Sequence, residues 1–354
     1  MTRHARLLPL LVACTVACTV ACSFEGSSRP PGGALTVRGE VVNFPDSAAI
    51  TGQATVNATA LIPAPAIAVT GTSFEVEGIL EHSIFDLAVT VAPTHRTTYN
   101  QVTVVSTEEL GLEAFAVSEA FVQKLVAAFG ATTATKGILF AHLVDDGGAG
   151  KAGIAASELA LGAGTSGPFF LDANLEPAPG ATMTSASGWV IYFEVPPGVV
   201  SLAAASTTTV TLDMPTSLVG AASVTLAEVV VTPGAPMPLP TNIAFETQIL
   251  PIFDRRGCGD CHSKNGDGSQ EAGLTLATNS SNAADIVFAE LVTERPNIRV
   301  VPAAPETSLV LTMPSREVPA DRHPNVTFAN ALDPDYRLLF AWIMEGARRT
   351  PPPV

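Results

Sequence analysis

Charged and aromatic residues are scarce in this chain, at 14% and 6% of its 354 residues. Basic residues are scarcer than acidic ones, with 18 Lys and Arg against 33 Asp and Glu, which gives a formal net charge of −15. So acidic a chain is repelled by nucleic acid and by anionic membrane surfaces, so we expect no nucleic acid as a partner and no electrostatic attraction to a membrane. Hydrophobic residues reach 47%, so the chain can bury a core, and disorder is not expected over most of its length.

Common motifs of hydrolytic and nucleotide-dependent enzymes are also missing. The sequence contains no G-x-S-x-G, no H-E-x-x-H and no phosphate-binding loop. We therefore expect no enzyme activity, although a haem-dependent activity stays open as an alternative.

Cysteine is absent from residues 23–257, so the middle of the chain must be held by core packing without disulfides. The five Cys fall in two groups, Cys14, Cys18 and Cys22 near the N-terminus and Cys258 and Cys261 in the last third.

The N-terminal segment has the pattern of an export signal. Arg3 and Arg6 precede an apolar run from Leu7 to Val20, and a polar stretch begins at Ser23. The apolar run is shorter than the roughly 20 residues that a membrane-spanning helix requires.

Three cysteines punctuate this segment in the repeat V-A-C-T-V-A-C-T-V-A-C, which resembles the lipobox of bacterial lipoproteins. The resemblance implies a lipoprotein signal over residues 1–21, lipidation of Cys22 and a linker over residues 22–33. Cys14 is an alternative lipidation site with a shorter apolar core before it, and an ordinary signal peptide is the other alternative. The expected location is the bacterial cell envelope, with a lipid anchor, facing the periplasm or the cell surface.

Strand patterns dominate residues 34–117 and 133–232, and a helix is predicted over residues 118–130, with Ser118 as its cap and Gly130 at its end. The stretches R-G-E-V-V-N-F and G-T-S-F-E-V-E-G, and later H-L-V-D-D-G-G-A-G-K-A-G-I and S-G-W-V-I-Y-F-E-V-P-P-G, resemble carboxypeptidase-regulatory-like domains. The resemblance implies two all-β sandwich domains of transthyretin or immunoglobulin-like type, joined by the predicted helix.

A Pro-rich linker over residues 233–240 leads into a C-terminal domain, residues 241–354. This domain contains Cys258-Gly259-Asp260-Cys261-His262. C-x-x-C-H is the attachment pattern of c-type haem, in which two thiols form thioethers and the imidazole binds the iron. The alternatives are a redox disulfide and a zinc site formed by Cys258, Cys261, His262 and His323.

The flanking sequence adds a family resemblance. The stretches F-E-T-Q-I-L-P-I-F, A-G-L-T-L, V-V-P-A-A-P-E-T-S-L-V-L and D-Y-R-L-L-F-A-W-I-M-E-G-A resemble the small cytochrome c domains of exported bacterial proteins, including the planctomycete type, over residues 242–348. The resemblance implies an all-α domain with one covalent haem c and His262 as the proximal iron ligand. Met313, in L-T-M-P-S, is the expected distal ligand. His323 is the alternative distal ligand. A third possibility is Met344 as the ligand, or a distal iron position without a protein ligand.

Two functions follow as expectations. The first is one-electron transfer by an envelope-anchored monohaem cytochrome c, with redox proteins of the envelope as partners and the membrane reached through the N-terminal lipid. The alternative is an envelope scaffold lipoprotein whose β-sandwich domains bind glycans or proteins, with the haem in an accessory or sensory role.

Overall fold

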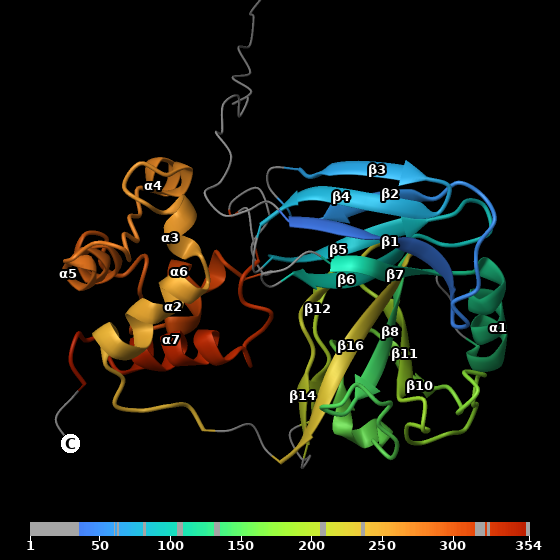
Figure 1. Cartoon of the computed structure of the whole chain (residues 1–354). Helices are drawn as coiled ribbons and strands as arrows, with labels where there is room; N and C mark the ends of the chain where they lie inside the picture. The colour runs from blue at the N-terminus through green and yellow to red at the C-terminus, as the bar shows by residue number, and fades with distance from the viewer. Residues whose placement is uncertain are drawn as a thin grey trace, which may run out of the picture.

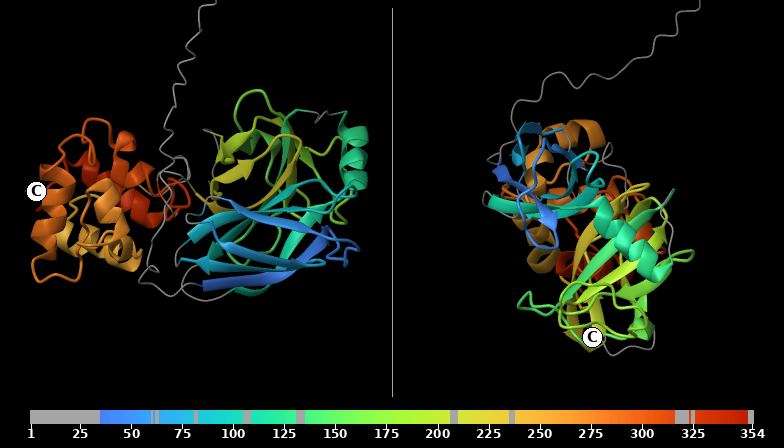
Figure 2. Two further views of the ribbon diagram at one scale, coloured as in Figure 1. Left: turned by 90° about the horizontal axis from the view of Figure 1, so that it is seen from above. Right: turned by 90° about the vertical axis from the view of Figure 1, so that its right-hand side faces the viewer.

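The computed structural model describes residues 35–59, 61, 64–80, 83–104, 109–130, 135–205, 210–234, 238–315, 323 and 326–351. The predicted signal (1–21), the linker (22–33) and the lipidation site Cys22 lie outside these residues. The described chain forms a β part, residues 35–234, and a helical part, residues 238–351, which lie side by side in two perpendicular views (Figures 1 and 2).

The β part contains sixteen described strands, one α-helix and one short 3-10 helix. The strands before the helix are β1 (Leu35–Phe44), β2 (Thr55–Thr59), β3 (Ala66–Thr70), β4 (Ser73–Ile79), β5 (Ser83–Thr90), β6 (Thr98–Val104) and β7 (Glu109–Val117). After α1 (Glu119–Phe129) come β8 (Gly137–Val144), η1 (Ala156–Glu158), β9 (Leu159–Ala160), β10 (Ser166–Phe170), β11 (Trp189–Val195), β12 (Gly198–Val200), β13 (Ala203–Ala204), β14 (Val210–Asp213), β15 (Ser217–Val219) and β16 (Val224–Pro233).

A four-stranded sheet, in the order β3-β4-β1-β7, forms the top layer in Figure 1. Its inward side chains alternate with outward ones, as expected for a sheet with one buried face. Val37 and Val76 are buried on the inner face and join a core with Phe85 and Leu87 of β5. The top sheet is thereby packed on the strands β2, β5 and β6 of a larger sheet.

The larger sheet has eight strands, in the order β10-β11-β8-β16-β6-β5-β2, with β14 paired to β16 off this path. β16 is parallel to both of its central neighbours: Val224 is opposite Thr98 of β6 and opposite Ile138 of β8. Strands from before and after α1 therefore belong to one sheet. The predicted fold of two separate β-sandwich domains is therefore wrong. The prediction failed because strand periodicity in a sequence does not reveal which strands pair.

Helix α1 lies at the edge of the β part and has both expected caps (Figure 1). The Ser118 side chain accepts a hydrogen bond from the backbone N–H of Phe121, and Gly130 adopts the left-handed conformation, with φ 66°, that ends the helix. Val122 and Leu125 are buried in a second core of the eight-stranded sheet.

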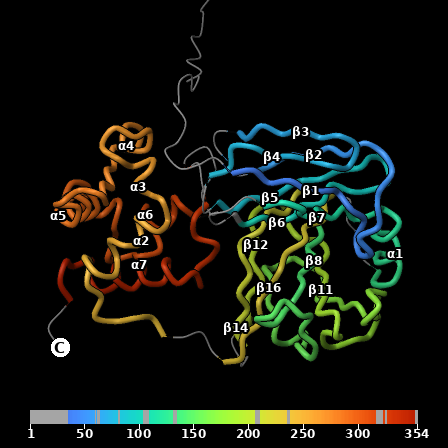
Figure 3. The backbone as a smooth tube through the Cα atoms, viewed as in Figure 1, coloured from blue at the N-terminus to red at the C-terminus, as the bar shows by residue number. Residues whose placement is uncertain are grey.

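The helical part follows β16, as the tube in Figure 3 shows. Its elements are the π-helical turn η2 (Phe245–Ile249), α2 (Leu250–Arg255), α3 (Cys258–Cys261), α4 (Asp267–Ala272), α5 (Ala283–Phe288), the π-helical turn η3 (Ala289–Thr293), η4 (Pro305–Thr307), α6 (Leu309–Thr312) and α7 (Pro334–Met344). Its core includes Phe245 and Trp342, whose ring centres lie 5.4 Å apart.

The prediction of an all-α cytochrome c domain is also wrong. Strands dominate the described chain, and the α-helices of the helical part are few and short, from four residues in α3 to eleven in α7. Pro251 stands in the first turn of α2, where its missing N–H costs no helical hydrogen bond, and left-handed Gly257 separates α2 from α3. These breaks keep the helices of this part short.

Backbone hydrogen bonds attach the helical part to the β part. The N–H of Thr216 donates to the carbonyl of Ala329 (3.1 Å), and the N–H of Ile84 donates to the carbonyl of Val326 (3.3 Å). The Asn330 amide adds bonds to Asp213 Oδ1 (2.6 Å) and to the carbonyl of Met214 (2.9 Å). Within the described residues, no helix is long and apolar enough to span a membrane.

Candidate functional site

The predicted attachment motif occupies one short helical turn. Gly257, with φ 67°, turns the chain out of α2, and Cys258 and Cys261 begin and end α3. Residues three apart lie on the same side of a helix, so both cysteines share one face of the turn. Both are free thiols, and Cys258 packs against the core of the helical part.

Both thiols are held in the neutral form. Burial raises the pKa of the Cys258 thiol to about 12, and it also raises the pKa of Cys261. A thiolate is the nucleophilic form of cysteine, so at neutral pH neither side chain is activated for attack. The reactive C-x-x-C of a redox enzyme has the opposite property, a lowered thiol pKa.

His262 follows the turn and is fixed by the next loop. Its Nδ1 donates to the carbonyl oxygen of Leu274 (2.9 Å). Burial lowers the pKa of His262, so the neutral ring carries its proton on Nδ1 and keeps Nε2 unprotonated. Gly268 packs so closely on this ring that a Cβ there would lie 3.0 Å from it. Leu274 and Gly268 were not predicted as part of this site; the glycines of N-G-D-G, which begins three residues after His262, were the available signal for Gly268.

The structure brings together His262 and His323, the alternative distal ligand. Their ring centres lie 6.4 Å apart, and the ring planes differ by 17°. Met313, the expected distal ligand, is partly buried at the C-cap of α6. Met344 is 56% exposed at the end of α7 and does not lie in the core. The roles assigned to Cys258, Cys261, His262, Met313 and His323 stay predictions.

The predicted cofactor, one covalent haem c, is corrected by the structure. Among the described residues, no group of three or more His, Cys, Asp and Glu side chains could hold a metal ion. A C-x-x-C-H motif fixes the spacing of its residues along the chain. A metal centre also needs ligands from other segments, and the sequence could not place those in space.

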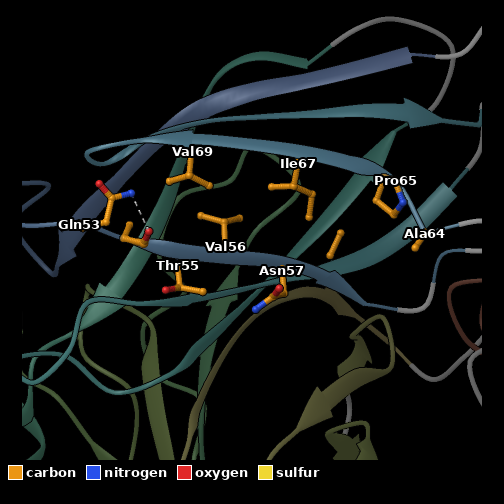
Figure 4. Close-up of a pocket in the computed structure, with 10 residues that line it drawn as sticks. Gln53, Thr55, Val56, Asn57, Ala64, Pro65, Ile67 and Val69 are labelled. Atoms are coloured by element: carbon orange, nitrogen blue, oxygen red, sulfur yellow. Dashed lines mark hydrogen bonds between the residues drawn. The ribbon is translucent and has the colours of Figure 1, made fainter.

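A second candidate site lies between the open edges of the two sheets. β2 ends the eight-stranded sheet and β3 ends the four-stranded sheet, so each has one edge without a strand partner among the described residues. The two edges border one groove, which we call the edge groove (Figure 4). It is lined by Gln53, Ala54, Thr55, Val56, Asn57, Ala58, Ala64, Pro65, Ile67 and Val69.

The edge groove has an apolar interior and no charge. Val56 is buried and Ile67 and Val69 are half-buried, and these side chains lie between the two strands in Figure 4. Asn57 and Thr55 are exposed on the rim. None of the ten lining residues is charged, although the chain carries a formal net charge of −15. Natural sheets commonly place charges or Pro on exposed edges to prevent pairing, and the two edge strands themselves carry neither.

The outer face of the four-stranded sheet, next to the edge groove, is acidic. Glu40, Glu75, Glu77 and Glu113 lie on this face, and Arg38 is the basic residue among them, 2.5 Å from Glu75. Arg38 lowers the pKa of Glu75 through its hydrogen bond.

Comparisons with known proteins identify no family. No protein-family model matches the sequence, and no curated protein matches it. Weakly similar solved structures include the Bacillus anthracis TIE protein (12% identity, TM-score 0.20, covering 59% of this chain and 38% of that one). Another is the shaft pilin SpaA from Lactobacillus rhamnosus GG (11% identity, TM-score 0.18, covering 58% of this chain and 100% of that one). A third is the group B streptococcus pilus 2b backbone protein (11% identity, TM-score 0.17, covering 60% of this chain and 97% of that one). Similarity at this level defines neither a fold family nor a function.

Proposed function

We propose that this chain is an exported protein of the cell envelope that binds another envelope component through its β part. The edge groove carries the proposal, because two sheets end side by side there in strands that can still form hydrogen bonds. Export is supported by the N-terminal pattern, with Arg3 and Arg6 before the apolar run. One-electron transfer, the other predicted function, depended on haem c and is not part of the proposal.

The β part is suited to act as a rigid scaffold. β16 pairs with one strand that precedes α1 in the sequence and with one that follows it, so these strands form one sheet. The helical part is hydrogen-bonded to the same framework at Thr216 and Ile84. A component bound at the edge groove would therefore be held by a single connected framework.

Photo-cross-linking in living bacteria tests the binding. A photoreactive residue at Asn57, on the rim of the edge groove, is expected to link the full chain to an envelope component. The same residue at Leu110, which is 58% exposed on β7 at the opposite edge of the four-stranded sheet, is the matched control. Equal adducts from both positions, or none from Asn57, would refute the proposal.

Attachment through a lipid at Cys22 belongs to the same proposal and has its own test. Metabolic labelling with a fatty acid should mark the full chain, and Cys22→Ser should lose the label. Unchanged labelling of Cys22→Ser would show that Cys22 is not the lipid site.

A further inference from the structure

We infer that the edge groove receives an extended peptide segment of another protein, in which β-branched apolar residues alternate with Lys or Arg. This inference rests on the proposed binding function and specifies its partner. It follows from three features: the unpaired edges, the register of β3 against β4, and the charge of the neighbouring sheet face.

The unpaired edges favour an extended occupant. Both walls of the edge groove are strands of five residues, whose outer backbone N–H and C=O groups have no strand partner in the described chain. A protein segment can pair with the whole row of groups only in strand conformation, by adding itself to the sheet. A segment of about five residues matches the length of either wall.

The register of β3 fixes which side chains of an added strand point inward. Ile67 is opposite buried Val76, and Val69 is opposite buried Phe74, so both point into the edge groove. Alternate side chains of an added strand would meet this apolar surface. Short β-branched residues suit it, because they favour strands and shield Val56, Ile67 and Val69 from water.

The other side chains of the added strand would face the carboxylates. Ala66 is opposite Glu77 and Ala68 is opposite Glu75, so these alanines lie between the added strand and the two carboxylates on the outer face. Neighbouring strands are about 4.8 Å apart, so the carboxylates lie about 10 Å from the added strand. Lys and Arg side chains can cross the two small alanines with their apolar stems and place their charge beside Glu75 and Glu77.

The same charges disfavour a second copy as the occupant. Two copies paired edge to edge would bring their acidic outer faces together, and each copy has a formal net charge of −15. A partner with basic residues at alternate positions removes that repulsion.

A synthetic peptide provides the test. The probe is the full chain with acetyl-Lys-Val-Lys-Val-Lys-Val-Lys-amide, and the matched probe replaces every Lys by Glu. The lysine peptide is expected to bind saturably and to slow hydrogen exchange in β2 and β3, while β10, at the far edge of the eight-stranded sheet, is unaffected. Equal binding of the two peptides, or protection outside β2 and β3, would overturn the inference.

Variants locate the binding surface. Ile67→Lys places a charge in the edge groove and should weaken binding of the lysine peptide by about tenfold or more. Leu110→Lys, at the opposite edge, should leave the affinity for this peptide unchanged. Glu77→Gln should weaken its binding about twofold to fivefold, whereas Glu113→Gln, on β7, should not. Ala68→Lys changes only an exposed residue and should also weaken binding, so the test survives if Ile67→Lys fails to fold.

Two further outcomes separate this inference from the proposed function. If cross-linking at Asn57 succeeds but the lysine peptide does not bind, the function stands and the partner chemistry is wrong. If the chain instead dimerises with increasing concentration, and Ile67→Lys abolishes the dimer, a second copy is the occupant and the inference is overturned.

Discussion

Replacement of Arg256 should destabilise the helical part far more than replacement of an arginine whose partners all lie at the surface. Its guanidinium donates to Asp335 (2.6 Å), to Asp333 (2.7 Å) and to the carbonyl of Thr327 (2.7 Å), and it lies 5.6 Å from the centre of the Phe328 ring. These bonds connect the end of α2 to the start of α7 and to the segment that contacts the β part.

The magnitude follows from burial. The side chains of Asp333 and Asp335 are only 8% and 9% exposed. Loss of Arg256 removes an ion pair from each of them. Removing one partner of a buried ion pair costs about 3–5 kcal/mol, because the remaining charge stays desolvated. Arg255 still pairs with Asp335, so we expect Arg256→Met to fall near the lower end of that range.

Urea unfolding measures this effect. A Trp189→Phe background leaves Trp342, in the core of the helical part, as the reporter of fluorescence. Arg349→Met is the matched control, because Arg349 pairs with Glu246 and Asp285 at the surface, where such pairs contribute at most about 1 kcal/mol. If Arg256→Met costs no more free energy of unfolding than Arg349→Met, the buried network does not stabilise the helical part.

The pH dependence gives an independent check. Despite the opposing effect of burial, hydrogen bonds from Arg255 and Arg256 hold the pKa of Asp335 below its ordinary value of 3.8. A carboxyl with a lowered folded-state pKa stabilises the protein above its unfolded pKa, and this contribution is lost as pH falls through the folded value. The advantage of the wild type over Arg256→Met/Asp335→Asn should therefore be constant at neutral pH and should shrink below about pH 5. An advantage that is constant down to pH 2 would contradict the assignment.

Three other predictions concern the core, the thiols and the contact between the two parts. Tyr192 is 2% exposed, and its hydroxyl has no hydrogen-bond partner among the residues that the structure describes. Burial also raises its pKa, so Tyr192→Phe should leave the free energy of unfolding unchanged or raise it by about 1 kcal/mol. A loss of more than about 1 kcal/mol in urea unfolding would argue against this prediction. Iodoacetamide at pH 8 should alkylate Cys261 before Cys258 in the folded chain, because burial raises the pKa of Cys258 to about 12. Mass spectrometry measures the order of alkylation. Both thiols should react in urea, and a lack of reaction in urea would show that they are blocked. Asn330→Ala removes two hydrogen bonds to the β part and should speed hydrogen exchange at Thr216, whereas unchanged exchange would mean that these bonds do not fix the contact.

Local features of the fold could be predicted from the sequence, and pairing could not. The helix expected between Ser118 and Gly130 is α1, because capping depends on residues within a few positions of each other. The two predicted sandwiches are one framework, because β16 has neighbours from both predicted domains. Sequence periodicity contains no information about this parallel pairing.

The candidate sites show the same division. The C-x-x-C-H stretch forms one local unit, α3 followed by His262, whose ring is oriented by the Leu274 carbonyl. Whether further ligands gather around this unit depends on tertiary contacts, and haem c was predicted from the motif and the resemblance alone. The edge groove could not be predicted, because it exists only when two different sheets end at the same side of the molecule.

The edge groove and the helical part depend on the same strand. β5 holds β2, one wall of the edge groove, along five residue pairs, and the N–H of Ile84 at the start of β5 donates to Val326 of the helical part. β2 has no strand partner other than β5 in the described chain. The position of this wall is therefore determined by β5, and the helical part stabilises one end of that strand. In the proposed binding function, this arrangement would give the helical part a physical role, since fixing β5 preorganises the groove wall before a partner strand is added.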